Sequence, residues 1–296
     1  MTMRTGMLGL ILALVFGMLG RGTQAALRRL FAGRPALLFG APALLTLLFG
    51  AAAAGAGAFS WPLLFVAAVY LLIPTLLAFV QGPGPARRPS GADFALILLL
   101  WLPVEFGAGQ GLIPRPQQGF LHSVAYGVAI LLALVLFLGF RNWEGLKYTL
   151  PAGGRDFLYA AAGFAVCAPV LIVVGRWLEF IPPFHLPPQP QAARLLTQFL
   201  IILVATGLPE EILFRSLIQN GLMLRCGPGI GTLLLASFIF GCAHLNNGPQ
   251  PLPNWRYMIL ATIAGAAYGK VFQQSSSVWG SASLHALVDW TKHVFF

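Results

Sequence analysis

The feature that most limits how this chain can fold is a series of apolar runs, each long enough to cross a lipid bilayer. A helix needs about 20 apolar residues to span the hydrocarbon core, and runs of about that length recur along the whole sequence. Backbone groups inside a bilayer must bond to one another, so helices are the expected form of these runs. We therefore predict an all-α fold, a polytopic membrane helix bundle of about 8–10 transmembrane helices. The candidate spans lie at roughly 5–20, 36–58, 61–81, 94–114, 120–140, 157–180, 195–220, 229–246, 257–274 and 279–296.

The composition supports a membrane protein and argues against a nucleic-acid partner. Hydrophobic residues make up 58% of the 296 residues and charged residues only 9%, whereas a soluble domain averages about 25% charged. The net charge of +10, from 18 basic and 8 acidic residues, is typical of positively charged loops that contact membrane lipid. A nucleic-acid site would need a basic face on a soluble domain, and the sequence predicts no such domain. We expect an integral, multi-pass membrane protein; the sequence gives no indication of its oligomeric state.

One polar stretch divides the chain into two predicted parts. RNWEGLKYTLPAGGRD, at 141–156, is the longest polar segment, and we expect N-terminal transmembrane helices at 1–156 and a C-terminal helical core at 157–296. Neither part repeats the other, so the sequence does not support a transporter built from duplicated halves. The first run, 5–20, could instead be a cleaved signal peptide. We expect a retained helix, because arginines follow it as they would in a cytoplasmic loop.

Charged residues interrupt one apolar run, in the segment GLPEEILFRSLIQ at 207–219. A charge in the bilayer core costs at least a few kcal/mol, so each of these side chains needs a partner or a function. On a helix Glu211 and Arg215 share a face at i,i+4, whereas Glu210 is rotated by roughly 100° from Glu211. Arg215 can therefore neutralise Glu211 while Glu210 serves another purpose. The alternative is a structural ion-pair cluster of all three.

Two histidines strengthen the functional interpretation. FIFGCAHLNN (238–247) puts Phe240 and His244 on one helical face, and SLHALVDW (283–290) does the same for His285 and Asp289. One histidine in a membrane helix usually forms a helix-to-helix hydrogen bond. Two histidines together with a glutamate pair, an arginine and an aspartate favour a functional site. A carboxylate at Asp289 would fix the tautomer of His285 and leave its other nitrogen facing the site.

Three intramembrane protease chemistries lack their motifs here. No HExxH zinc motif is present, Ser281 and Ser283 lack the Gly-x-Ser-Gly setting of a rhomboid-type serine site, and no Gly-x-Gly-Asp occurs. What remains is a glutamate that activates water as general base, with imidazoles that polarise the carbonyl or hold the oxyanion. One carboxylate and two histidines could also bind a catalytic divalent metal such as zinc. We favour the metal-free form, because neither histidine stands in a tight ligand motif and Glu211 is better used by Arg215.

The order and spacing of these motifs resemble a known family. EEILFR at 210–215 corresponds to Glu-Glu-x-x-x-Arg, and FGCAH at 240–244 to Phe-x-x-x-His. AGAAYGKVFQQSSSVWGSASLHALVD at 264–289 looks like a Gly-rich helix followed by His-x-x-x-Asn/Asp. Over about residues 195–293 the chain resembles the CPBP family, the CAAX-processing and bacteriocin-processing intramembrane proteases, which include the type II CAAX prenyl endopeptidases.

The resemblance implies a helical membrane core with a polar chamber, whose catalytic set is Glu210, Glu211, Arg215, His244, His285 and Asp289. Within this set, Glu210 is the water-activating base with His244 beside it. Glu211 and Arg215 are the supporting pair, and His285 with the residue at position 289 completes the site. The family has been described both as metalloproteases and as glutamate proteases, so the resemblance leaves the metal open.

The implied activity is that of an intramembrane endopeptidase similar to CAAX prenyl endopeptidases, cleaving a membrane-anchored or lipidated peptide with Glu/His-activated water. The alternative is a non-catalytic membrane scaffold or regulator of the same family. Asp289 stands where eukaryotic and archaeal CAAX proteases tend to have Asn and bacterial members often have Asp. A prenylated substrate is therefore one option among lipidated peptides, and the expected location is a bacterial plasma membrane.

Two further expectations concern packing. GAAYG at 265–269 is expected to form a seam of small residues that lets helices approach closely. His244 lies near the end of its predicted span and His285 near the start of a span two crossings later, which would place them at different depths. Either one helix is offset or broken, or the span boundaries are wrong. We nevertheless expect Glu210, Glu211, His244, His285 and Asp289 to converge in one polar cavity.

Overall fold

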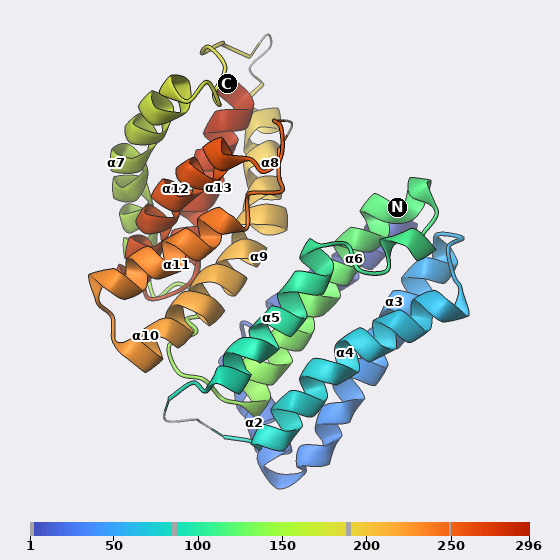
Figure 1. Cartoon of the computed structure of the whole chain (residues 1–296). Helices are drawn as coiled ribbons and strands as arrows, with labels where there is room; N and C mark the ends of the chain where they lie inside the picture. The colour runs from blue at the N-terminus through green and yellow to red at the C-terminus, as the bar shows by residue number, and fades with distance from the viewer. Residues whose placement is uncertain (1–2, 85–87, 188–190, 249) are drawn as a thin grey trace. The chain divides into compact units, whose positions relative to one another are not determined.

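The computed structural model describes residues 3–84, 88–187, 191–248 and 250–296, and throughout these ranges the regular elements are helices (Figure 1). The predicted all-α fold is confirmed. The chain divides into two compact units, Met1–Glu144 and Gly145–Phe296. This division falls inside the polar stretch 141–156; the assignment of 1–156 and 157–296 as separate domains stays a prediction.

The N-terminal unit is built around α6, whose side chains are the most completely buried of the unit. α1 and α3 pack against α6, and α4 packs between α3 and α5. α1 and α2 meet at a bend of 81°. The helices of this unit are α1 (Met3–Gly17), α2 (Arg21–Gly33), η1 (Pro35–Phe39), α3 (Gly40–Gly55), α4 (Trp61–Gln81), α5 (Gly91–Glu105), η2 (Gln110–Leu112), α6 (Arg115–Leu134) and η3 (Val135–Phe140).

The C-terminal unit contains all the residues of the predicted site. α11 and α12 form its most extensive helix pair, and α7 packs against α12 and α13. The run from α8 to α10 is helical without a break, with π-helical stretches at η4 and η5. The helices are α7 (Arg155–Trp177), α8 (Ala192–Ile202), η4 (Leu203–Gly207), α9 (Leu208–Glu211), η5 (Ile212–Gln219), α10 (Asn220–Cys226), α11 (Ile230–Cys242), α12 (Trp255–Gln274) and α13 (Trp279–Phe295).

The structure confirms a multi-pass helical membrane protein, with fewer full-length spans than expected. Within the described residues, five helices are long and apolar enough to cross a membrane, or six if the bent pair α1 and α2 is one span. Three other predicted spans are helical but short: α5, α11 and α13 have 15, 13 and 17 residues. The long spans are Pro35–Gly55, Trp61–Gln81, Arg115–Phe140, Arg155–Trp177 and Ala192–Cys226.

The predicted seam of small residues is confirmed on α12. A Cβ atom added at Gly269 would lie 2.4 Å from Gln219 Oε1 and 2.6 Å from Leu233 Cδ1. One added at Gly265 would lie 3.1 Å from Phe240 Cδ1. These glycines therefore let α12 lie directly against η5 and α11, the two helices that carry the central residues of the site.

Candidate active site

The glutamate pair lies between two π-helical stretches of one long helix. α9 holds Glu210 and Glu211, with η4 before it and η5 after it. Pro209 has no backbone N–H, so it cannot donate the α-helical hydrogen bond to Ala205, and the wider η4 turn precedes it. π turns inside α-helices occur frequently at functional sites. Gly207 brings this segment close to α13, since a Cβ atom there would lie 3.0 Å from Ala282 O.

The predicted ion pair of Glu211 and Arg215 is present and fully buried. Arg215 Nε lies 3.0 Å from Glu211 Oε2, and both side chains are 0% exposed. The guanidinium also lies over the rings of Phe240 and Tyr268, with its Cζ atom 4.9 Å and 5.8 Å from the ring centres. A buried charge is stable only when paired, so this pair and its aromatic walls form one unit.

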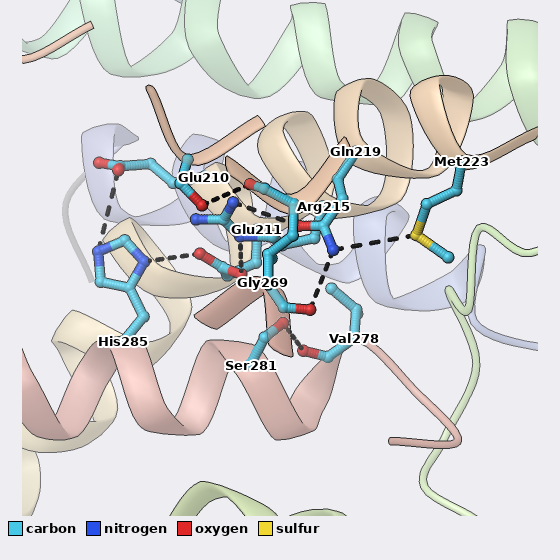
Figure 2. A network of polar contacts seen from close by, with 11 residues as sticks. Glu210, Glu211, Arg215, Gln219, Met223, Gly269, Val278, Ser281 and His285 are labelled. Atoms are coloured by element: carbon cyan, nitrogen blue, oxygen red, sulfur yellow. Dashed lines mark hydrogen bonds and ion pairs between the residues drawn. The ribbon is translucent and has the colours of Figure 1, made fainter. Parts of the chain in front are cut away.

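Gln219 extends this unit and was missed from the sequence. Its Oε1 accepts from Arg215 Nη1 at 3.5 Å, and its Nε2 donates to Gly269 O at 2.9 Å (Figure 2). Gln219 stands four residues after Arg215, as Arg215 stands four after Glu211. This repeated i,i+4 spacing is the sequence pattern from which the role of Gln219 could have been predicted. Through Gln219 the buried pair is tied to the backbone of α12.

His285 lies among three carboxylates. Its Nδ1 is 3.0 Å from Glu211 Oε1 (Figure 2), while its Nε2 is 3.9 Å from Glu210 Oε2 and 3.5 Å from Asp289 Oδ2. Asp289 lies near one ring nitrogen of His285, as expected, but the other nitrogen also faces a carboxylate. Glu211 takes the Nδ1 side, and Asp289 lies on the Nε2 side together with Glu210. The reason is that α9 and η4 pack against α13, a long-range contact that i,i+4 spacing does not reveal.

Aromatic rings fix the plane of His285. The Tyr268 ring stacks on it at 4.7 Å with an interplanar angle of 20°, and Phe240 meets it edge-on at 5.8 Å. Phe240 also contacts Phe214 and His244. Phe240 and His244, which were predicted to share one helical face, are therefore in contact, and Phe240 packs against the rings of both histidines.

His244 is held in one orientation at the end of α11. Its Nδ1 lies 2.8 Å from Phe240 O, so the Nδ1–H donates to that carbonyl. Its ring lies edge-on to Tyr257 at 4.5 Å. In the neutral ring the lone pair is then on Nε2. The contact described above for Glu210 is with His285, and the expected placement of His244 beside Glu210 stays a prediction.

A small cavity joins the two histidines and resolves the question of depth. It has a volume of about 70 Å³ between α7, α11, α12 and α13, and His244, His285 and Asp289 all line it. α11 has only 13 residues, about 20 Å, so its end and His244 stay at a depth that α13 also reaches. The predicted span 229–246 therefore extended too far, since α11 ends at Cys242. Glu210 and Glu211 contact His285, which lines the cavity, but they do not line it themselves.

Lys292 is a further cavity residue that was missed from the sequence. Its ammonium lies 4.6 Å from the centre of the Phe180 ring and 4.8 Å from that of Tyr257. It stands three residues after Asp289 and seven after His285, which places all three on one face of α13. That helical spacing could have indicated it.

The donor atoms do not fit a resident metal ion as they lie. Across the ranges that the structure describes, no three His, Cys, Asp or Glu side chains are grouped as metal ligands. Both ring nitrogens of His285 already face carboxylates, and His244 Nδ1 faces a carbonyl. Metal dependence stays a prediction to be tested.

Comparison with known proteins identifies the segment that carries this site. Residues 192–291 match the family model described as Rce1-like, type II CAAX prenyl endopeptidase Rce1-like. The match contains every residue of the predicted catalytic set, and the resemblance expected over about 195–293 is confirmed. No curated protein and no solved structure gives a significant match to the chain.

Proposed function

We propose that this chain, whose residues 192–291 belong to the CPBP family, is an intramembrane endopeptidase that cleaves a membrane-anchored or lipidated peptide. The observation that carries the proposal is the approach of Glu210 Oε2 to within 3.9 Å of His285 Nε2 inside the family segment. A carboxylate and an imidazole this close can bind one water molecule between them. Such a water is the nucleophile that peptide hydrolysis requires.

Glu210 is the better candidate for the general base. Its side chain is 24% exposed, whereas the Glu211 side chain is 0% exposed and is engaged by Arg215 and His285. A base must reach the water, so exposure distinguishes the two glutamates. In the proposed step, Glu210 takes a proton as the water oxygen attacks the carbonyl carbon. Protonated Glu210 then gives that proton to the leaving amine as the peptide C–N bond breaks.

His285 is suited to stabilise the oxyanion. Donation from Nδ1 to Glu211 orients the ring, and the carboxylates of Glu210 and Asp289 favour a second proton on Nε2. In a doubly protonated ring, the Nε2–H can shift its hydrogen bond from the water to the carbonyl oxygen as the water attacks and negative charge develops there. Stacking on Tyr268 keeps that donor in place during the reaction.

The walls of the cavity support a substrate that comes from the membrane. Most of its lining is apolar or aromatic, from residues such as Phe164, Leu171 and Leu260. A soluble peptide gains little from such a surface, whereas a segment tethered to the bilayer is already concentrated beside it. A prenylated peptide is one such substrate. Asp289, which the resemblance associates with bacterial members, supports a location in a bacterial plasma membrane.

The proposal is tested with the full chain in proteoliposomes. The substrates are a farnesylated peptide, a peptide with a transmembrane anchor, and the same peptide without an anchor. We expect cleavage of at least one anchored substrate by the wild type and a loss of at least about 10²-fold for Glu210→Gln. The matched control is Glu179→Gln, whose side chain is 81% exposed in a surface pair with Arg256. Thermal unfolding in detergent verifies that both variants fold.

Two results would reject the proposed role of Glu210 or the activity itself. Cleavage by Glu210→Gln at the wild-type rate would remove Glu210 from the mechanism. Failure of the wild type to cleave any substrate would favour the scaffold alternative, provided that a cellular phenotype of the deletion is rescued equally by wild type and Glu210→Gln at matched abundance.

A further inference from the structure

A basic hollow lies on the C-terminal unit, apart from the proposed active site. It has a volume of about 350 Å³, and His185, Arg194 and His293 line it together with Gln198. The three basic side chains come from three separate segments: the connection before α8, the first turn of α8 and the last turn of α13. Among the described residues that line it, none is acidic.

The frame of this basic hollow is fixed by contacts among the same three segments. Trp290 Nε1 donates to Leu195 O at 3.0 Å, which fastens α13 to the start of α8. His185 N donates to Phe295 O at 2.9 Å, and the Phe184 ring stacks on that of Phe295 at 5.9 Å. The ends of α13 and α8 accordingly lie side by side in this unit (Figure 1). Arg194 and His293 are thus brought together by two packed helices, and the backbone bond of His185 to Phe295 holds the connecting segment beside them.

Donor groups in the hollow remain available for a ligand. His293 uses Nδ1 on Asp289 O, at 2.8 Å, which leaves its Nε2. No hydrogen bond or ion pair joins the Arg194 guanidinium to another described residue. The Arg194 guanidinium and the histidine nitrogens together offer an anion several hydrogen-bond donors at one place. An arginine with a planar fork of donors suits the oxygens of a phosphate group.

The surroundings of the hollow point to a lipid as the source of that phosphate. α8 begins the candidate membrane span Ala192–Cys226, so the hollow lies at an end of a span, where lipid headgroups are found. An apolar side chain is exposed next to His185 in the chain, since Leu186 is 73% exposed. A phospholipid matches both features, with its phosphate on Arg194 and an acyl chain against apolar surface near His185.

We infer that the hollow lined by His185, Arg194 and His293 binds the phosphate headgroup of an anionic membrane phospholipid. This site is separate from the proposed catalytic reaction and uses none of its residues. The net positive charge of the chain indicates only a general affinity for anionic membranes. The hollow is instead a specific site for one lipid headgroup.

The test measures lipid binding to the purified full chain by native mass spectrometry in detergent. Phosphatidylglycerol and phosphatidylcholine are titrated against wild type, Arg194→Gln and the control Arg225→Gln. Arg225 is exposed at the opposite end of the same span, so the control loses the same charge. We expect phosphatidylglycerol to bind more tightly than phosphatidylcholine, and its affinity to fall roughly fivefold in Arg194→Gln only.

A double variant and a soluble anion make the outcome decisive. His185→Gln with His293→Gln should also weaken phosphatidylglycerol binding, while thermal unfolding confirms the fold. Equal losses in Arg194→Gln and Arg225→Gln would overturn the inference, because binding would then follow total charge. Protection from unfolding by inorganic phosphate alone, with no preference for phosphatidylglycerol, would also overturn the lipid assignment and identify a soluble phosphate as the ligand.

Discussion

Arg215 is the residue on which the buried charges depend. It pairs with Glu211, donates a hydrogen bond to the amide oxygen of Gln219 and lies over the Phe240 ring. Arg215→Ala leaves Glu211 buried without its cation, and we expect a loss of about 3–5 kcal/mol in the free energy of unfolding. Thermal unfolding in detergent measures this loss, with Arg225→Ala as an exposed control. Equal stability of Arg215→Ala and the wild type would refute the ion-pair assignment.

The carboxylates around His285 favour a mechanism without a metal ion. No three His, Cys, Asp or Glu side chains are grouped as metal ligands in the described part of the chain, and the carboxylates of Glu210 and Asp289 near Nε2 favour a proton on that nitrogen. We expect purified protein to retain its cleavage activity after exhaustive chelation and to contain no stoichiometric zinc. Loss of activity on chelation, with recovery on adding one divalent ion per chain, would instead assign Glu210, His244 and His285 as ligands.

At the scale of helices, the start of α13 is held by a clamp formed by Lys147, in the segment before α7, and Asp156, in the first turn of α7. Lys147 Nζ donates to Phe272 O and Ser275 O, both at 2.7 Å, and so caps the end of α12. Asp156 accepts from the backbone of Ser276 at 2.8 Å and from the hydroxyl of Ser277. This clamp holds the connection between α12 and α13 two turns before His285.

Weakening the clamp should therefore change catalysis as well as stability. Asp156 is 2% exposed, and we expect Asp156→Ala to lower the free energy of unfolding by about 1–3 kcal/mol. At temperatures where it remains folded, its kcat should fall while KM changes little, because His285 is displaced while the apolar cavity walls on α11 and α12 stay in place. Steady-state kinetics in proteoliposomes tests this, with the neighbouring exposed Arg155→Gln as control. A wild-type kcat in folded Asp156→Ala would show that the clamp does not position His285.

Also at the scale of helices, i,i+4 spacing in the sequence predicted contacts correctly, whereas the predicted helix boundaries were inaccurate. The pair of Glu211 and Arg215 and the seam at 265–269 follow from i,i+4 repeats, and both are present. Hydropathy marks apolar runs without showing where a helix stops. α5, for example, ends at Glu105, two residues after Pro103, well short of the predicted end at 114.

For the whole molecule, the fold class was predictable because a bilayer admits few structures, whereas the site was predictable only in part. Composition and periodicity identified the helices and the residues that carry charge within them. The partners of those charges depend on packing between distant segments. The contact of His285 with Glu211 joins residues 74 positions apart, and the place of Lys292 in the cavity depends on α7 and α12. No local pattern contains that information.

The shortness of α11 has a consequence for the lipid around the protein. Its 13 residues extend about 20 Å, against a hydrocarbon core of about 30 Å. A helix with this hydrophobic mismatch draws the two leaflets toward each other or leaves polar surface at one of its ends. Either result shortens the path from bulk water to the end of α11, where His244 begins the cavity wall. The proposed hydrolysis requires such a supply of water, and we expect the short α11 to favour it.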